Sequence, residues 1–184
     1  WGCAKIGAIL VCLNWRLAAP ELEEMMHDST PVAFIYDPAF AATAAVLKEH
    51  MGFDRVVTLA ERAPEGESTY EAALAQSSGR PIVMPATPLD TIWHILYTGG
   101  TTGRSKGVIQ THAMVLFNAI NIGLKLNLTS EDVSLNLLPY FHTGGLNLLT
   151  NPTFYAGGTA IVQKAFDPAE TLRAVRWLMG DLDV

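Results

Sequence analysis

A dense run of glycines, hydroxyl side chains and one lysine lies between Tyr97 and Val108 of this 184-residue sequence and reads YTGGTTGRSKGV. Glycines allow backbone N–H groups to converge on an anion without clashes from Cβ atoms, and such concave loops bind phosphate. Serine and threonine hydroxyls add hydrogen-bond donors, and a lysine adds a mobile positive charge. We therefore predict a phosphate-binding loop, while composition leaves open a flexible hairpin turn in which Lys106 is merely solvated. The candidate phosphate-binding residues are Thr98, Gly99, Gly100, Thr101, Thr102, Gly103, Ser105, Lys106 and Gly107.

The spacing within this loop argues against two common nucleotide-binding motifs. A Walker A loop needs a glycine followed directly by lysine and then by serine or threonine. Here Lys106 is followed by Gly107, and Gly103 lies three positions before the lysine. The dinucleotide-binding pattern GxGxxG is also missing from this stretch. Both the P-loop NTPase and the Rossmann interpretations are therefore disfavoured.

A second motif, LPYFHTGGLN, extends from Leu138 to Asn147. We expect a strand to end here, so that the His–Thr–Gly–Gly sequence places an imidazole at the sheet edge and lets the backbone approach a ligand. The structural alternative is a helix N-terminus in which Thr143 acts as the cap and His142 simply packs. The candidate ligand-binding residues of this motif are His142, Thr143, Gly144 and Gly145.

The glycine loop resembles the phosphate loop of the adenylate-forming enzymes, which include acyl-CoA synthetases, luciferases and peptide-synthetase adenylation domains. Their usual form is aromatic–Thr–Ser–Gly–Thr–Thr–Gly–X–Pro–Lys–Gly–Val. This sequence departs from it at Gly99, where serine is usual, and at Ser105, where proline is usual. We expect these changes to loosen the loop without abolishing binding. The motif LPYFHTGGLN, the opening GCAKIGAILVCLNWRL and the late segment FDPAETLRAV extend the resemblance over essentially the whole chain.

The resemblance implies ATP-dependent activation of a carboxylic acid to an acyl-adenylate, with Mg²⁺ sharing the phosphate charge, followed by transfer to coenzyme A. It also places His142 beside the acyl-substrate pocket. Amino-acid-activating members usually carry an aspartate after the phenylalanine, whereas His142 follows Phe141 here, so a fatty or aromatic acid fits better than an amino acid. The catalytic lysine of adenylation is expected beyond this chain, and we locate no catalytic residue within it. We expect little turnover from the isolated piece; a non-catalytic nucleotide- or phosphate-binding domain is the alternative.

The elements that must position these motifs follow an α/β pattern. Strands are predicted at 31–37 and 55–60 on either side of an alanine-rich helix, an order typical of parallel sheets. A strand at 91–97 delivers the glycine loop and a strand at 106–111 leaves it. Further helices are predicted at 20–29, 70–76, 112–126, 146–158 and 167–179, and further strands at 133–139 and 159–163. We therefore expect partial parallel or mixed sheets flanked by helices, as part of the large N-terminal domain of an adenylate-forming enzyme.

Within this domain fragment, 1–184, we expect three parts: an α/β segment over 1–60, a linker-like connection rich in Pro, Gly and Ser over 61–90, and a phosphate-loop and acyl-pocket segment over 91–184. The chain opens on Trp1 in the middle of an expected element, so we expect both ends to lie inside a longer protein.

Composition narrows the remaining possibilities. Hydrophobic residues make up 49% and charged residues 16%, which favours a packed core over disorder. The net charge of −6 and the lack of a basic run argue against a nucleic-acid partner.

The apolar stretch Ile6–Leu13 is too short to span a bilayer, so we expect no transmembrane segment. Cys3 and Cys12 have no second pair to complete a zinc site, and the five histidines show no metal-ligand spacing, so we expect reduced thiols, no protein metal site and a cytoplasmic location. The oligomeric state stays open.

Overall fold

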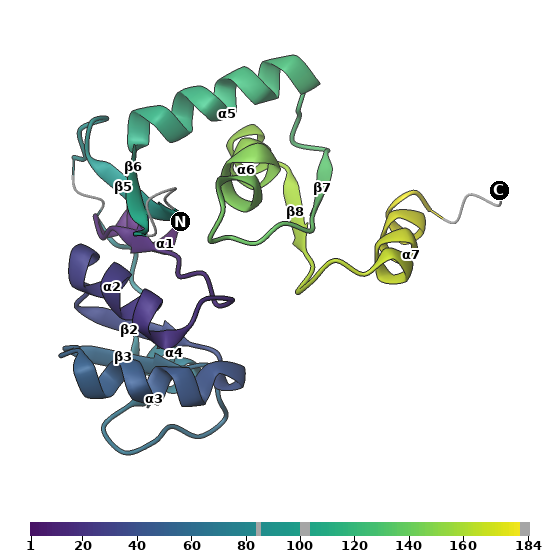
Figure 1. Cartoon of the computed structure of the whole chain (residues 1–184). Helices are drawn as coiled ribbons and strands as arrows, with labels where there is room; N and C mark the ends of the chain where they lie inside the picture. The colour runs from purple at the N-terminus through teal and green to yellow at the C-terminus, as the bar shows by residue number, and fades with distance from the viewer. Residues whose placement is uncertain (84–85, 100–103, 181–184) are drawn as a thin grey trace. The chain divides into compact units, whose positions relative to one another are not determined.

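A computed structural model describes residues 1–83, 86–99 and 104–180 (Figure 1). The chain divides into two compact units. The first unit comprises Trp1–Ala86 and Tyr97–Val108, and the second comprises Thr87–Leu96 and Ile109–Val184. Both contain helices and short parallel strands, which confirms the predicted α/β class.

The first unit is built around a parallel sheet with the strand order β2-β3-β4. Its β2 and β3 strands are joined by a helix and pair in register from Ala33↔Arg55 to Tyr36↔Thr58, which confirms the predicted β–α–β crossover. The elements of this unit are α1 (Gly2–Lys5), β1 (Leu10–Val11), α2 (Ala19–Ser29), β2 (Ala33–Tyr36), η1 (Pro38–Phe40), α3 (Ala41–His50), β3 (Arg55–Thr58), β4 (Ser68–Thr69) and α4 (Tyr70–Gln76).

The helices of the first unit begin and end for local reasons. The Glu21 carboxylate accepts a hydrogen bond from the backbone N–H of Ala18 at 3.0 Å, which satisfies a donor at the start of α2. The Asp37 carboxylate likewise accepts from Ala39 N–H at 2.8 Å and starts η1. The alanine-rich helix α3 ends at His50, after which Met51 takes an extended conformation.

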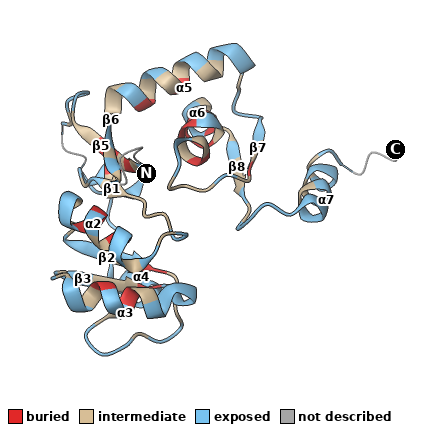
Figure 2. Cartoon of the chain, in the orientation of Figure 1, coloured by how far each residue is buried: buried red, intermediate tan, exposed pale blue. Residues whose placement is uncertain are grey.

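An apolar cluster between α2 and α3 forms the core of the first unit. Leu22, Met25 and Met26 from α2 pack with Leu47 from α3, and all four are buried. Figure 2 shows these buried positions on both helices. The β2 strand is buried on one face only: Tyr36 is buried, whereas Ile35 is 60% exposed. Successive side chains of a strand point to opposite faces, and only one face of β2 meets this core.

The segment 61–90 carries more structure than a plain connection. It contains β4 and α4, and β4 pairs in parallel with β3. The Glu67 carboxylate forms an ion pair with Lys48 of α3 and accepts a hydrogen bond of 2.7 Å from the Tyr36 hydroxyl of β2. A charged side chain therefore holds the start of this segment against the sheet.

The second unit contains a parallel pair of strands and the helices that precede, join and follow them. Its elements are α5 (His112–Leu126), β7 (Val133–Asn136), the π-helix η2 (Gly144–Thr150), α6 (Asn151–Ala156), β8 (Thr159–Val162) and α7 (Pro168–Leu178). Strands β7 and β8 lie side by side in Figure 1 and pair in parallel from Val133↔Thr159 to Asn136↔Val162. Strands β5 (Ile92–Thr98) and β6 (Lys106–Thr111) have residues in both units, and their sheet has the order β1-β5-β6.

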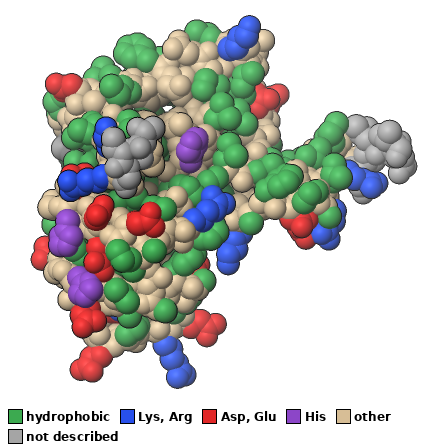
Figure 3. All heavy atoms as spheres, viewed as in Figure 1, with side chains coloured by type: hydrophobic (Ala, Val, Ile, Leu, Met, Phe, Trp, Pro, Cys, Tyr) green, Lys and Arg blue, Asp and Glu red, His purple; other side chains and the backbone are tan. Residues whose placement is uncertain are grey.

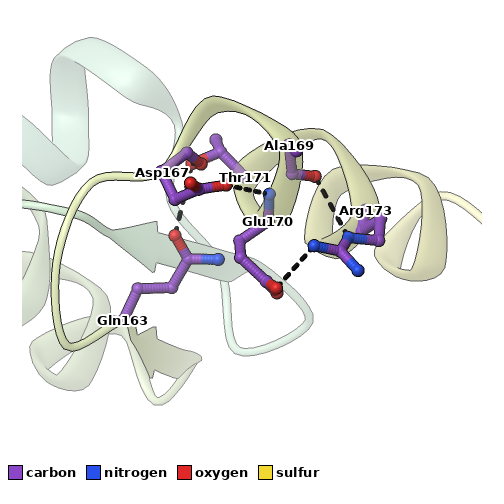
Figure 4. A network of polar contacts seen from close by, with 6 residues as sticks. All are labelled: Gln163, Asp167, Ala169, Glu170, Thr171 and Arg173. Carbon is purple, nitrogen blue, oxygen red and sulfur yellow. Dashed lines mark hydrogen bonds and ion pairs between the residues drawn. The ribbon is translucent and has the colours of Figure 1, made fainter.

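Side-chain caps start two helices of the second unit, α5 and α7. Thr111 caps α5 by accepting from Met114 N–H at 3.3 Å, and Asn127 ends it in the left-handed conformation. Asp167 caps α7 by accepting from Glu170 N–H at 2.8 Å, as Figure 4 shows. Glu170 in turn forms an ion pair with Arg173 one turn later, at 2.5 Å. The α7 helix is thus stabilised locally by its own polar residues.

Exposed apolar side chains are prominent on α7. Leu172 and Trp177 are both largely exposed, and Figure 3 shows hydrophobic side chains gathered over this helix. No helix in the described ranges is both long enough and apolar enough to cross a membrane.

Candidate functional site

The glycine loop leaves β5 and enters β6, as the sequence predicts. Gly100, Thr101, Thr102 and Gly103 lie outside the described residues. On the flanks of the loop, Thr98, Gly99 and Lys106 are exposed, while Ser105 and Gly107 are half-buried. The hydroxyl of Thr98 and the ammonium of Lys106 therefore remain accessible to an anionic ligand.

Tyr97, the aromatic residue that opens the loop motif, fixes the end of β5 within the first unit. Its hydroxyl lies 2.6 Å from Asp28 Oδ2 and donates toward the Met25 carbonyl at 3.1 Å. Burial and the hydrogen bond with Asp28 raise the pKa of Tyr97 to about 12, so the phenol stays a donor at neutral pH. The ring also packs against the α2–α3 core. The loop thus departs from an anchored strand end.

Gly99 is not required by packing within the described part of the chain. A Cβ added there meets no described atom within 4 Å, and the residue does not take a left-handed conformation. A side chain such as serine, the usual residue of the similar loops, therefore fits at this position.

The segment after β7 forms a compact turn around His142. The His142 backbone N–H donates to the Pro139 carbonyl at 3.1 Å, and the His142 carbonyl accepts from Gly145 N–H at 3.0 Å. His142 Nδ1 accepts from the Gly144 N–H at 3.1 Å, which leaves Nε2 as the donor nitrogen of the neutral ring. His142 and Thr143 are exposed. The imidazole is therefore oriented by its own backbone and presented to solvent rather than packed in the core.

Gly145 makes this turn possible, while Gly144 is packed less strictly. A Cβ on Gly145 would lie 2.3 Å from the Pro139 carbonyl oxygen and 2.7 Å from that of Leu138, a clash with backbone. A Cβ on Gly144 would lie 3.0 Å from the Leu138 side chain. The alternative interpretation of this motif was a helix N-terminus, and a helix does start here, because η2 begins at Gly144. Thr143, however, makes no side-chain cap, and its hydroxyl oxygen instead accepts from Asn147 Nδ2 at 3.0 Å.

A buried polar network behind this turn was missed by the sequence reasoning. The Asn136 amide donates to the carbonyls of Leu138 and Gly145, each at 3.2 Å, and the Thr150 hydroxyl donates to Gly145 at 2.7 Å. Asn147 donates to the side chain of Gln110 at 2.6 Å as well as to Thr143. The signal that could have revealed it is the recurrence of asparagine in otherwise apolar segments, since a buried amide needs partners.

His94 on β5 is a further buried polar group of the second unit. It is 1% exposed, and its Nε2 has no hydrogen-bond partner among the described residues. Burial lowers the pKa of His94, while a side-chain hydrogen bond with Gln110 acts in the opposite direction. The neighbouring Trp93 ring stacks on the His112 ring, with 5.1 Å between the ring centroids. His94 is therefore a neutral core imidazole at neutral pH.

The cysteines and the possible metal ligands are the remaining candidates for a reactive centre. Cys3 and Cys12 are free thiols, and burial raises the pKa of Cys12 to about 11, which keeps it protonated. Across 1–83, 86–99 and 104–180, no three His, Cys, Asp or Glu side chains gather so as to hold a metal ion.

Comparison with known proteins identifies the family. The family described as "AMP-binding enzyme" matches residues 1–178, and the chain belongs to it. It is 35% identical over 95% of its length to the indoleacetate–CoA ligase of Aromatoleum aromaticum, and 35% identical over 95% to a feruloyl-CoA synthase of Amycolatopsis sp.. The crystal structure of ATP-bound MatB from Rhodopseudomonas palustris superposes with a TM-score of 0.79 at 30% identity over 93% of this chain and 33% of that one. The chain spans about a third of the length of these relatives, 34% and 33%.

Proposed function

We propose that the protein containing this chain is an AMP-forming acid–thiol ligase. It would join a carboxylic acid to ATP, giving an acyl-adenylate and pyrophosphate, and then transfer the acyl group to coenzyme A with release of AMP. The observation that carries the proposal is the match of the AMP-binding enzyme family over residues 1–178, which includes both the glycine loop and the His142 turn. Since the chain spans about a third of its relatives' length, we further propose that residues 1–184 alone have little turnover.

In the first step, a carboxylate oxygen attacks the α-phosphorus of ATP and the bond to pyrophosphate breaks. The chemistry depends mostly on positioning and on cationic stabilisation of phosphate charge. We assign the grip on the β- and γ-phosphates to the glycine loop, with Lys106 as the positive charge. The other members of this proposed site are Thr98, Gly99, Gly100, Thr101, Thr102, Gly103, Ser105 and Gly107. Accessible Thr98 and Lys106 beside an anchored strand end support this assignment.

We place the acyl group beside His142, Thr143, Gly144 and Gly145. The exposed imidazole with a free Nε2 donor, and the close backbone approach that glycine allows, support this placement. The residue after Phe141 is a histidine rather than an aspartate, so the proposed substrate is a fatty or aromatic acid and not an amino acid. Two similar proteins are named for indoleacetate and for ferulate, so aromatic acids are the first to test.

Mg²⁺ is the metal that we propose as cofactor. It is usually bound through one or two carboxylates together with substrate phosphates, so the phosphates gripped by the loop would supply most of its ligands. A cytoplasmic location and the lack of a nucleic-acid partner complete the proposal. The net charge of −6 and the absence of a basic run in the sequence support the second of these.

The decisive experiment removes the proposed phosphate grip. In the protein that contains this chain, Lys106→Ala together with Thr102→Ala should lower kcat/KM for ATP by about 100-fold or more, as measured by acid-dependent pyrophosphate release. Lys125→Ala is the matched control, because Lys125 is an exposed lysine at the end of α5, outside both motifs. Normal adenylation by the double variant would refute the loop assignment. If the wild-type protein binds ATP tightly but releases no pyrophosphate with any acid, the alternative function, a non-catalytic nucleotide-binding domain, is favoured.

A further inference from the structure

Asn147 is a fully hydrogen-bonded side chain near the His142 turn. Its Nδ2 donates to Gln110 Oε1 at 2.6 Å and to Thr143 Oγ1 at 3.0 Å, while its Oδ1 accepts from Asn151 Nδ2 at 2.9 Å. Both amide hydrogens and the amide oxygen are thus in use, so the side chain has one favoured orientation. Asn147 is only 7% exposed, and a buried amide that lost these partners would be costly.

The partners of Asn147 come from four different elements of the second unit. Gln110 lies on β6, Asn151 begins α6, and Thr143 belongs to the turn. In addition, Asn118 of α5 donates through Nδ2 to the Asn147 backbone carbonyl at 2.7 Å. Asn147 therefore connects the strand and the two helices to the turn that carries His142.

The inner and outer parts of the turn are held by different residues. Its inner end is fixed at the Gly145 carbonyl, which accepts from the amide of Asn136 and the hydroxyl of Thr150. Its outer end, His142 and Thr143, is exposed. There the Thr143 hydroxyl accepts a hydrogen bond from the side-chain amide of Asn147. The exposed segment is thus held by the amide of Asn147 in addition to its own backbone hydrogen bonds.

The helix that carries Asn147 is itself unusual. Residues Gly144–Thr150 form a π-helix, which is wider than an α-helix and is frequently found at functional sites. In this helix Asn147 reaches back to Thr143, four residues earlier, and forward to Asn151, four residues later. Two side-chain hydrogen bonds thus fasten the wide turn at both ends.

We propose that Asn147, supported by Gln110, is a positioning residue that holds Thr143 and His142 in the direction required by the acyl substrate and so sets which acids are accepted. The inference rests on the proposed function of the chain. A displacement of about 1 Å in a substrate-positioning segment is enough to lower rates strongly. Asn147 itself is buried behind the turn and acts through Thr143 and the backbone of the turn, rather than by touching the substrate.

The test uses the complete protein that contains this chain, two acids of different shape, and acid-dependent pyrophosphate release. Asn147→Asp keeps the size and the acceptor but removes the donor to Gln110 and Thr143. We expect the KM for the better acid to rise about tenfold, the preference between the two acids to change about threefold or more, and the KM for ATP to stay within about twofold. Gln110→Leu, which removes the acceptor of the Asn147 donor on β6, should act in the same direction, and Gln110→Glu, which keeps an acceptor there, should stay close to the wild type.

The Gln110 pair keeps the test decisive if Asn147→Asp fails to fold, because Gln110 is only half-buried and leucine is of similar size. Unchanged acid preference in the folded variants, an equal rise in the KM for ATP, or a glutamate variant that behaves like the leucine variant would each overturn the inference alone, provided that the wild type is active. A wild type that releases no pyrophosphate with any acid would overturn the proposed function and this inference with it.

Discussion

The two units of this chain bury different chemistry. Among the described residues, the first unit buries chiefly apolar side chains, with Leu22, Met25, Met26 and Leu47 at its centre. The second unit also buries a set of amides and hydroxyls: Asn136, Asn147, Thr150, Asn151 and Thr153. Apolar packing is non-directional and tolerates adjustment, whereas hydrogen bonds fix angles as well as distances. The second unit is therefore the better suited to hold a loop in one shape.

Glycines in the two proposed binding segments show the same contrast. Gly145 is enclosed so tightly that a Cβ would overlap backbone atoms of Pro139, whereas a Cβ on Gly99 would meet nothing described within 4 Å. Glycine is thus required by close packing at position 145, behind the His142 turn, but not at position 99, at the edge of the glycine loop. A sequence motif alone does not separate these two uses.

The largest expected effect comes from breaking the tighter of these two segments. Gly145→Ala forces a methyl group against the Pro139 carbonyl, which must move together with its hydrogen-bonded turn, so we expect a loss of about 3 kcal/mol in the free energy of unfolding. The matched variant Gly99→Ala should change it by less than about 0.5 kcal/mol. Urea unfolding of both purified variants beside the wild type measures the difference. Equal losses at the two positions would contradict the contrast.

A smaller effect is expected from the charged contact of the first unit. Burial raises the pKa of Glu67, but hydrogen bonds from Lys48 and Tyr36 outweigh burial and hold it below its ordinary value of 4.5. The hydrogen bond with Glu67 raises the pKa of Lys48 above its ordinary 10.5. The ion pair of Glu67 with Lys48 therefore stabilises the fold fully between the two ordinary pKa values, 4.5 and 10.5. Its contribution is lost as the pH falls through the lowered pKa of Glu67 or rises through the raised pKa of Lys48.

Glu67→Gln tests this pH dependence, because glutamine keeps an acceptor for the Tyr36 hydroxyl but loses the charge that pairs with Lys48. We expect about 1–2 kcal/mol of destabilisation at pH 7, shrinking toward zero as the pH falls below the pKa of Glu67. Melting temperatures of the two proteins across the acid range provide the measurement. Asn136 and Asn147 of the second unit carry no charge, so their contribution should not titrate. A pH-independent difference between Glu67→Gln and wild type would show that the contact stabilises through shape and not through charge.

Much of the fold was accessible from the sequence because its elements carry strong local signals. The helix at α5 and the strand at β6 were predicted with the observed bounds, and apolar spacing is the signal for the helix. The helix that starts at Asp167 was likewise predicted, and the Asp167 side chain caps it. The short strand β4 was missed because two residues leave no periodic pattern. The hydrogen bonds of Glu67 were missed because partners distant in sequence decide them.

The candidate site was predicted unevenly for the same reason. The position of the His142 turn after a strand follows from its motif, but the partners that orient it do not. Gln110 and Asn147 are 37 positions apart, and only folding brings their amides to 2.6 Å. Polar residues in apolar segments indicate that partners exist without indicating which residues they are. The glycine-loop roles of Gly100–Gly103 remain predictions, since these residues lie outside those described.

The smallest expected effect concerns Gly99, the glycine that packing does not require. Gly99→Ser introduces the hydroxyl that is usual in similar phosphate loops, at a position where a side chain meets no described atom. If the loop grips ATP as proposed, one added donor should lower the KM for ATP by about two- to fivefold and leave the KM for the acid unchanged. Gly99→Ala is the control that adds the Cβ without the donor, so any gain shared by both variants would come from backbone stiffening. A serine variant that changes the KM for the acid and not that for ATP would place Gly99 outside the phosphate site, and the open space around it would then have no part in nucleotide binding.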